Sequence, residues 1–110
     1  MNLLIDKQCR HYSSKESALS AEEIEKLRSA TPAWAYDSSE NALVRVFAFD
    51  DYYQTIGFVN KVAEIAHQED HHPQLLVTYN QCRISYNTHT VNGVTENEFI
   101  CAAKIDQLLS

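Results

Sequence analysis

The chain has 110 residues, a hydrophobic share of 45% and a charged share of 22%, which are typical of one globular domain. Nine Lys and Arg against fifteen Asp and Glu give a net charge of −6, which argues against direct binding of nucleic acid. No apolar run approaches the roughly 20 residues that cross a bilayer, so no membrane association is expected.

Cysteine usage and the N-terminus indicate the compartment. Cys9, Cys82 and Cys101 are widely spaced and odd in number, and no CxxC motif occurs. A disulfide framework is therefore not expected, and Cys82 and Cys101 fall in apolar patterns typical of small core residues. The N-terminus lacks the apolar stretch and cleavage pattern of a signal peptide, so we expect a reducing, cytoplasmic location.

Residues 1–18 have no clear periodicity and are interpreted as a leader segment that lies over the folded domain, residues 19–110. The first helix opens that domain, because Ser20 and Glu23 form a capping box. The helix should run to about residue 30, since Pro32 disfavours helical backbone at the residue before it.

A β-hairpin and a long helix come next. Segments 34–36 and 42–49 flank a polar turn and predict the two strands of the hairpin. Asp50 is a suitable N-cap for a helix over about 51–67, whose apolar positions cover an arc of roughly 180°.

The last third of the chain predicts two strands and a helix. Segments 75–79 and 82–89 are the strands, and the second alternates well between apolar and polar residues. Thr95 and Glu98 form another capping box, which opens a helix from 96 to about 109.

The predicted order is therefore α-β-β-α-β-β-α. Strands that arrive as hairpins imply a four-stranded antiparallel sheet with the helices on one face, a two-layer α+β sandwich. Exposed edge strands invite pairing with a second copy. The wide apolar arcs of the second and third helices also predict a homodimer or homotetramer.

Three histidines are the candidate functional residues. His71 and His72 are adjacent before Pro73, and His89 is expected on the uncovered polar face of the last strand. Neighbours in an extended chain point to opposite sides, so both imidazoles of the pair can meet one ligand only if the backbone bends. The competing interpretation is a solvated helix end, where a charged histidine suits the helix dipole.

Acid–base chemistry fits these histidines better than metal binding. Adjacent histidines are poorly spaced for zinc and no HExxH motif occurs, so no metal site is expected. No glycine-rich phosphate loop is present, which disfavours a nucleotide cofactor. Imidazoles exchange protons near neutral pH, as general acid and base catalysis requires. The single tryptophan, Trp34, is either a stacking platform for a planar substrate or a core aromatic.

An ordered set of short motifs runs through the chain and is specific only as a set. Its members are Trp34, His71-His72-Pro73, Tyr79-Asn80, Thr88-His89, Gly93-Val94-Thr95 and Ile105-Asp106. Over about residues 19–109 this set resembles the pterin-4a-carbinolamine dehydratase family, also called 4a-hydroxytetrahydrobiopterin dehydratase. The predicted order of helices and strands also matches the fold of that family.

The resemblance implies a hydro-lyase that converts 4a-hydroxytetrahydropterin to quinonoid dihydropterin and water, in tetrahydrobiopterin recycling. It implies catalysis without a cofactor or metal by His71, His72 and His89. We expect His71 and His89 to exchange protons around the C4a hydroxyl and N5, and His72 to orient the pterin. The expected substrate contacts are Trp34, Pro73, Thr88 and Glu98.

Two positions depart from the family pattern. His67 stands where the family usually has an acidic residue, and it would not raise the pKa of His71 as a carboxylate would. Glu98 replaces the usual Asp, which changes the reach of that side chain. The resemblance also leaves an alternative open, in which the fold is a non-catalytic dimerisation or assembly cofactor of a transcription factor or another protein.

Overall fold

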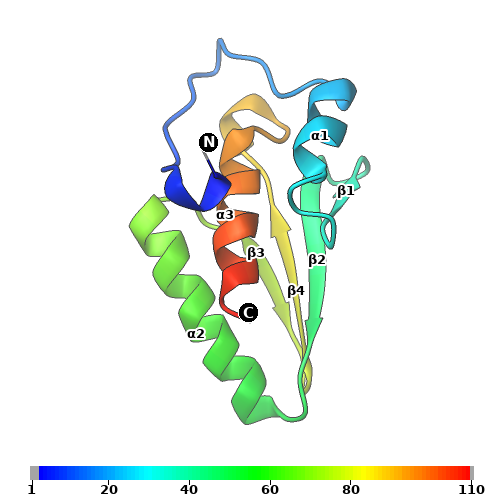
Figure 1. Cartoon of the computed structure of the whole chain (residues 1–110), viewed down its shortest axis with the longest axis vertical. Coiled ribbons are helices and arrows are strands. Elements are labelled where there is room, and N and C mark those ends of the chain that lie inside the picture. Colours follow the sequence, from blue (N-terminus) through cyan, green and yellow to red (C-terminus); the bar gives the residue numbers. More distant parts are fainter. Residues whose placement is uncertain (1–2, 110) are drawn as a thin grey trace.

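The computed structural model describes residues 3–109, and its elements follow the predicted order (Figure 1). The first half comprises a 3-10 helix η1 (Leu4–Asp6), helix α1 (Ala21–Arg28), strands β1 (Ala35–Asp37) and β2 (Ala42–Ala48), and helix α2 (Tyr52–Glu69). The second half comprises β3 (Gln74–Val77), β4 (Gln81–Tyr86), a 3-10 helix η2 (His89–Val91) and α3 (Glu96–Gln107). None of the described helices is long and apolar enough to span a membrane.

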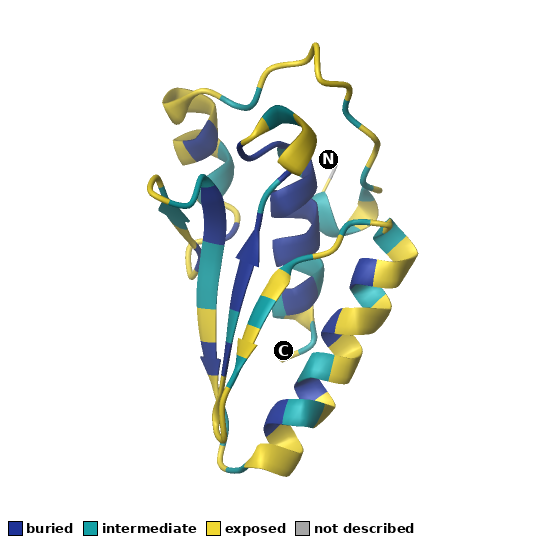
Figure 2. Cartoon of the chain, turned by 180° about the vertical axis from the view of Figure 1, so that it is seen from behind, coloured by how far each residue is buried: buried dark blue, intermediate teal, exposed yellow. Residues whose placement is uncertain are grey.

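The four strands form one antiparallel sheet in the order β1-β2-β4-β3, which confirms the predicted α+β sandwich. The helices lie on one face of the sheet, and Figure 2 views the molecule from the opposite, uncovered side. Alternation along the strands sends Phe47, Ile84 and Tyr86 into the core, where Phe47 packs on Phe58 of α2 at 4.7 Å between ring centroids. Arg83 and Ser85 of β4 are thereby left on the uncovered face.

Local capping signals set the starts of the helices. Both predicted capping boxes, at Ser20 and at Thr95, are present. The cap of α2 is Asp51 rather than the predicted Asp50, because Asp51 has the extended backbone of an N-cap and its carboxylate accepts the amide of Gln54. Asp50 instead donates its backbone N–H to the side chain of Gln54.

The predicted strand 82–89 ends early, at Tyr86. Tyr86 pairs with Leu43 at the end of the β2 ladder. Beyond it, Thr88 bonds to Gly93 across the following turn, with its amide 2.8 Å from the Gly93 carbonyl oxygen. His89 therefore does not lie on a strand; it begins η2.

The N-terminal segment, residues 3–19, runs across α3 and the end of α2 before it reaches α1 (Figure 1). Lys7 pairs with Glu96 at 2.7 Å, and the backbone of Arg10 exchanges two hydrogen bonds with the side chain of Asn97. These contacts help to bury α3 on several sides. Part of the apolar surface of α3 that predicted contact with another subunit is thus covered by the chain itself.

Candidate active site

The three candidate histidines line one surface cavity of about 300 Å³. His71 and His72 enter it from the end of α2, and His89 enters it from the start of η2. The N-terminal segment supplies another wall through Arg10, His11 and Tyr12. The tertiary fold therefore brings together all three histidines that the sequence singled out.

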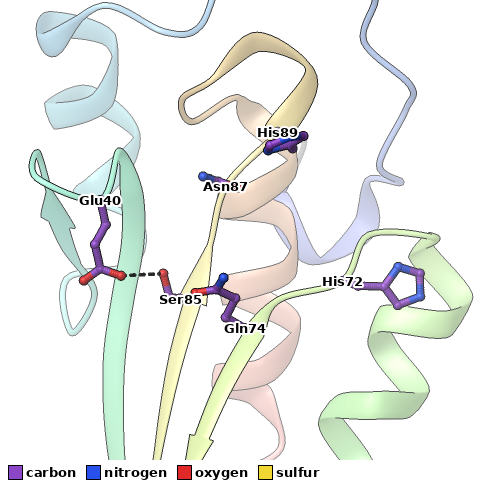
Figure 3. A pocket seen from close by; sticks show the side chains of 6 residues that line it. All are labelled: Glu40, His72, Gln74, Ser85, Asn87 and His89. Atoms are coloured by element: carbon purple, nitrogen blue, oxygen red, sulfur yellow. Dashed lines mark hydrogen bonds between the residues drawn. The ribbon is translucent and has the colours of Figure 1, made fainter.

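A second cavity, of about 250 Å³, adjoins the first and shares His72, Asn87 and His89 with it. It lies over the uncovered face of the sheet (Figure 3), where its remaining lining residues are Glu40, Gln74 and Ser85. Histidines at one end and polar side chains along the sheet thus form one continuous, mostly polar surface.

A left-handed residue produces the bend that the histidine pair requires. Asp70 ends α2 with φ 49° and ψ 46°, and the next amide, that of His71, bonds back to the Ala66 carbonyl at 3.1 Å. The chain then becomes extended toward β3. As a result the side chain of His71 turns inward and is 13% exposed, whereas His72 stays exposed.

His71 is fixed by a buried carboxylate and an aromatic ring. Its Nε2 lies 2.9 Å from Oε1 of Glu98, whose side chain is fully buried. Its ring stacks on that of Tyr86 at 5.1 Å between centroids, and the Tyr86 hydroxyl donates to the His71 carbonyl oxygen at 2.8 Å. Burial disfavours the charged imidazole, but the hydrogen bond and negative charge of Glu98 outweigh it and raise the pKa of His71.

Glu98 is itself held by Thr88 and Thr95. The Thr88 hydroxyl donates to Oε1 of Glu98 at 2.6 Å, and the Thr95 amide donates to Oε2 at 2.8 Å. All three residues are buried. Glu98 is therefore completely enclosed and contacts the cavity-lining His71, and its predicted contact with the substrate stays a prediction.

The other predicted contact residues occupy different places. Thr88 borders the histidine cavity, but its hydroxyl is engaged by Glu98. Pro73 is half-buried between His72 and β3 and lines neither of the two cavities. Its part is to keep His72, the residue before it, in an extended conformation.

Trp34 is a core residue in the described chain. Its side chain is completely buried, edge-on to Phe47 at 5.9 Å, and its indole N–H donates to Asp106 at 2.8 Å. Asp106 also pairs with Arg45 at 2.6 Å. Of the two interpretations of Trp34, the structure agrees with that of a core aromatic. A stacking platform would need an exposed ring face, and the ring of Trp34 is enclosed.

The sequence did not single out the polar wall of the second cavity. Ser85 and Asn87 occupy polar positions of the predicted strand 82–89, and its alternation was the signal that could have indicated them. Glu40 carried no such signal, because it stands in a turn far from β4 in sequence. In the fold it accepts hydrogen bonds from Arg83 and from Ser85, the latter at 3.2 Å (Figure 3).

Within residues 3–109, no group of three or more His, Cys, Asp and Glu side chains is arranged to hold a metal ion. The chemistry that the arrangement offers is proton transfer, by one partly buried histidine paired with a carboxylate and two exposed histidines beside it.

Comparisons with known proteins identify relatives of this chain and agree with its fold. The family described as Pterin 4 alpha carbinolamine dehydratase matches residues 17–108. A protein of Nitrosomonas eutropha named "Putative pterin-4-alpha-carbinolamine dehydratase" is 47% identical over 107 residues, 96% of this chain and 93% of its own length. A protein of Legionella pneumophila with the same name is 43% identical over 96% of this chain and 95% of its own.

Two solved structures share the fold. A transcriptional coactivator/pterin dehydratase from Brucella melitensis superposes with a TM-score of 0.80 at 30% identity, covering 86% of this chain and 100% of that one. A pterin dehydratase-like protein described as a RuBisCO assembly factor of the alpha-carboxysome gives a TM-score of 0.59 at 23% identity, covering 89% and 95%. The second similarity concerns the fold alone.

Proposed function

Since the chain belongs to the pterin-4a-carbinolamine dehydratase family, we propose that it eliminates water from a 4a-hydroxytetrahydropterin to give quinonoid dihydropterin. The observation that supports this most is the convergence of His71, His72 and His89 on one cavity. The leaving hydroxyl on C4a needs a proton, and N5 must lose one as the C=N bond forms. Positioned imidazoles supply and accept protons near neutral pH.

The roles of the histidines follow from their surroundings. The raised pKa of His71 favours its protonated form, so His71 is assigned as the acid that protonates the leaving hydroxyl. His89, exposed at the cavity, is assigned as the base that takes the N5 proton. His72 lines both cavities and is assigned to orient the pterin. Glu98 is a positioning residue that keeps His71 charged and oriented.

The second cavity is assigned to the pyrimidine part of the pterin. That ring presents an amino group and a ring N–H along one edge, which a carboxylate can accept as a pair of hydrogen bonds. Glu40 is the carboxylate of this cavity, and Gln74, Ser85 and Asn87 supply further donors and acceptors. The substrate would then lie over the sheet with its C4a–N5 region at the histidines.

The decisive experiment follows the decay of chemically prepared 4a-hydroxytetrahydropterin by absorbance, with and without protein. Wild-type protein should accelerate the decay, and His71→Ala should lose most of that acceleration. Decay at the uncatalysed rate with wild type, or full acceleration by His71→Ala, would overturn the proposal. The location proposed for this activity is the cytoplasm.

A second candidate is a role in assembly or dimerisation, which the names of the structural relatives suggest. The feature of this chain that favours it is exposed apolar area on the uncovered sheet face, at Val46 and Leu76, which are 50% and 62% exposed. Capture of a stoichiometric protein partner, unaffected by Ala substitution of the three histidines, would support this role. Loss of the partner on those substitutions would count against it.

Association with further copies of the chain is part of the proposal. The edge strand β3 and the exposed Tyr52 and Tyr53 of α2 leave pairing surface and apolar surface available. Light scattering should give a dimer or tetramer, and a single 12.6 kDa species would refute this association.

A further inference from the structure

Two cysteines that are far apart in sequence meet where the N-terminal segment crosses α3. The Sγ atoms of Cys9 and Cys101 lie 3.5 Å apart, although 92 positions separate the residues. Cys9 is partly exposed, whereas Cys101 is completely buried in the turn of α3 that follows Glu98. A disulfide bond is about 2.0 Å long, so a closing movement of about 1.5 Å would join the two sulfurs.

The surrounding contacts hold Cys9 in this position. Its backbone amide donates to Glu69 at 2.8 Å, and its thiol also lies 3.6 Å from the carbonyl oxygen of Asn97. The next residue, Arg10, is held by the Asn97 side chain through bonds of 3.1 and 2.7 Å. The backbone around Cys9 is thus held in place, and its sulfur contacts Asn97 as well as Cys101.

We propose that Cys9 and Cys101 are a thiol oxidation site, which a low-molecular-weight disulfide converts to an intramolecular disulfide that ties the N-terminal segment to α3. Cys9, the accessible thiol, loses its proton and attacks the small disulfide, and one thiolate leaves. Cys101 then attacks the Cys9 sulfur, displaces the second small thiolate, and passes its proton to it. Two protein thiols are oxidised and one small disulfide is reduced to two thiols.

In the reduced protein, the contact between the two thiols shifts their pKa values in opposite directions. The hydrogen bond from the Cys9 thiol lowers the pKa of Cys101, with further help from the Tyr86 hydroxyl and the charge of His71, against the effect of burial. The same contact raises the pKa of Cys9, which slows the first step, but Cys9 is the thiol of the pair that a small disulfide can reach. Because the shift at Cys101 depends on the free Cys9 thiol, it ends once a small thiol is attached to Cys9, and the second step rests on the short distance between the two sulfurs. Buried Cys82 has a raised pKa from burial and no such neighbour among the described thiols.

The consequence reaches the histidine cavity. Arg10, His11 and Tyr12 directly follow Cys9 and line that cavity, and Glu98 precedes Cys101 by one helical turn. Oxidation would fix this wall of the cavity to the helix that positions His71. This inference rests on the thiol geometry and stands whether or not the protein dehydrates a pterin.

The experiment counts thiols that react with an alkylating agent, by mass spectrometry of the unfolded protein, after incubation with oxidised or reduced glutathione. Wild type should have three reactive thiols when reduced and one, Cys82, when oxidised, with a peptide that links Cys9 to Cys101. Cys82→Ala should still form this link, as the matched control. Cys9→Ser, a substitution at a partly exposed position, should not form it.

A second readout follows the segment itself. On oxidation the amides of Cys9 and Arg10 should exchange hydrogen more slowly, and the thermal midpoint should rise by roughly 10 °C, because the cross-link closes a long loop. Neither change should occur in Cys9→Ser. Three reactive thiols after oxidation of wild type, a link that involves Cys82, or only intermolecular links would overturn the proposal.

Discussion

Nε2 of His71 and Oε1 of Glu98 lie 2.9 Å apart, and the carboxylate of this pair is completely buried. A carboxylate therefore does support the first histidine of the pair, although His67 stands where the family usually has an acidic residue. It comes from α3 instead of α2. The proton affinity of the candidate site depends on this contact between two elements.

Removing the charge of Glu98 should lower the pKa of His71. The side chain of Gln in Glu98→Gln has nearly the same size and can still form a hydrogen bond, but it has no negative charge. Burial then becomes the dominant influence on the pKa of the His71 imidazole. Titration of the His71 ring protons by NMR should then give a midpoint below the usual value, whereas wild type titrates above it. Glu96→Gln, on the same helix and paired with Lys7, is the control and should leave His71 unchanged.

The same pair predicts how stability depends on pH. The pKa of His71 is raised on folding above its ordinary value of 6.5, so the ion pair stabilises the fold fully below that pH. This contribution is lost as pH rises through the folded-state pKa. The free energy of unfolding, measured with urea across this pH range, should fall in wild type and should not fall in Glu98→Gln. Parallel plots of this free energy against pH for the two proteins would contradict the prediction.

Substitution of the cavity histidines should reduce turnover. His71→Ala and His89→Ala each remove a proton-transfer group, and a loss of about 10²–10⁴-fold in kcat is expected for each. His67→Ala is the control, because His67 is exposed on α2 and lines neither cavity. Equal loss in His67→Ala, with the fold intact by circular dichroism, would argue against the assigned roles.

Glu40→Gln should weaken substrate binding more than turnover. The neutral amide keeps the size of the side chain but accepts hydrogen bonds less strongly and loses its ion pair with Arg83. We expect KM to rise about tenfold with kcat little changed. A tenfold rise corresponds to a loss of about 1.4 kcal/mol of binding free energy, which is what weakening one charge-assisted hydrogen bond would cause. Glu25→Gln removes a comparable exposed pair with Arg28 on α1 and should leave KM unaltered.

Trp34→Phe separates a core role from substrate stacking. The variant loses the indole hydrogen bond to Asp106 and part of the packing against Phe47, so the free energy of unfolding should fall by about 1–3 kcal/mol. Because the side chain is completely buried, KM should stay at its wild-type value. Glu64→Ala, at an exposed position of α2, should change stability by less than about 0.5 kcal/mol. A raised KM in a stable Trp34→Phe protein would restore the stacking interpretation.

Short-range patterns predicted the fold well. The capping boxes at Ser20 and Thr95 depend on side chains three residues apart, and both are present. The alternation along β4 assigned its buried and exposed faces. The order of helices and strands followed from such local signals. The family was indicated separately, by the resemblance of the ordered motif set, and the family match over residues 17–108 confirms that resemblance.

The errors and omissions arise where distant segments meet. The end of β4 is set by its neighbour β2 and by the bond between Thr88 and Gly93. The alternation of apolar and polar residues continues to His89, so the predicted strand was too long. Glu40 reaches Ser85 only because β1, β2 and β4 are paired. The N-terminal segment has no periodicity of its own, and it is ordered by contacts with α2 and α3.

The sequence by itself determined which residues could exchange protons, because residue type and local spacing identify His71, His72 and His89. The tertiary structure decided what each one faces. His71 meets a carboxylate 27 positions away, Cys9 meets Cys101, and Trp34 is enclosed by the core. Side-chain environment depends on packing between elements that are distant along the chain, and no local pattern records it.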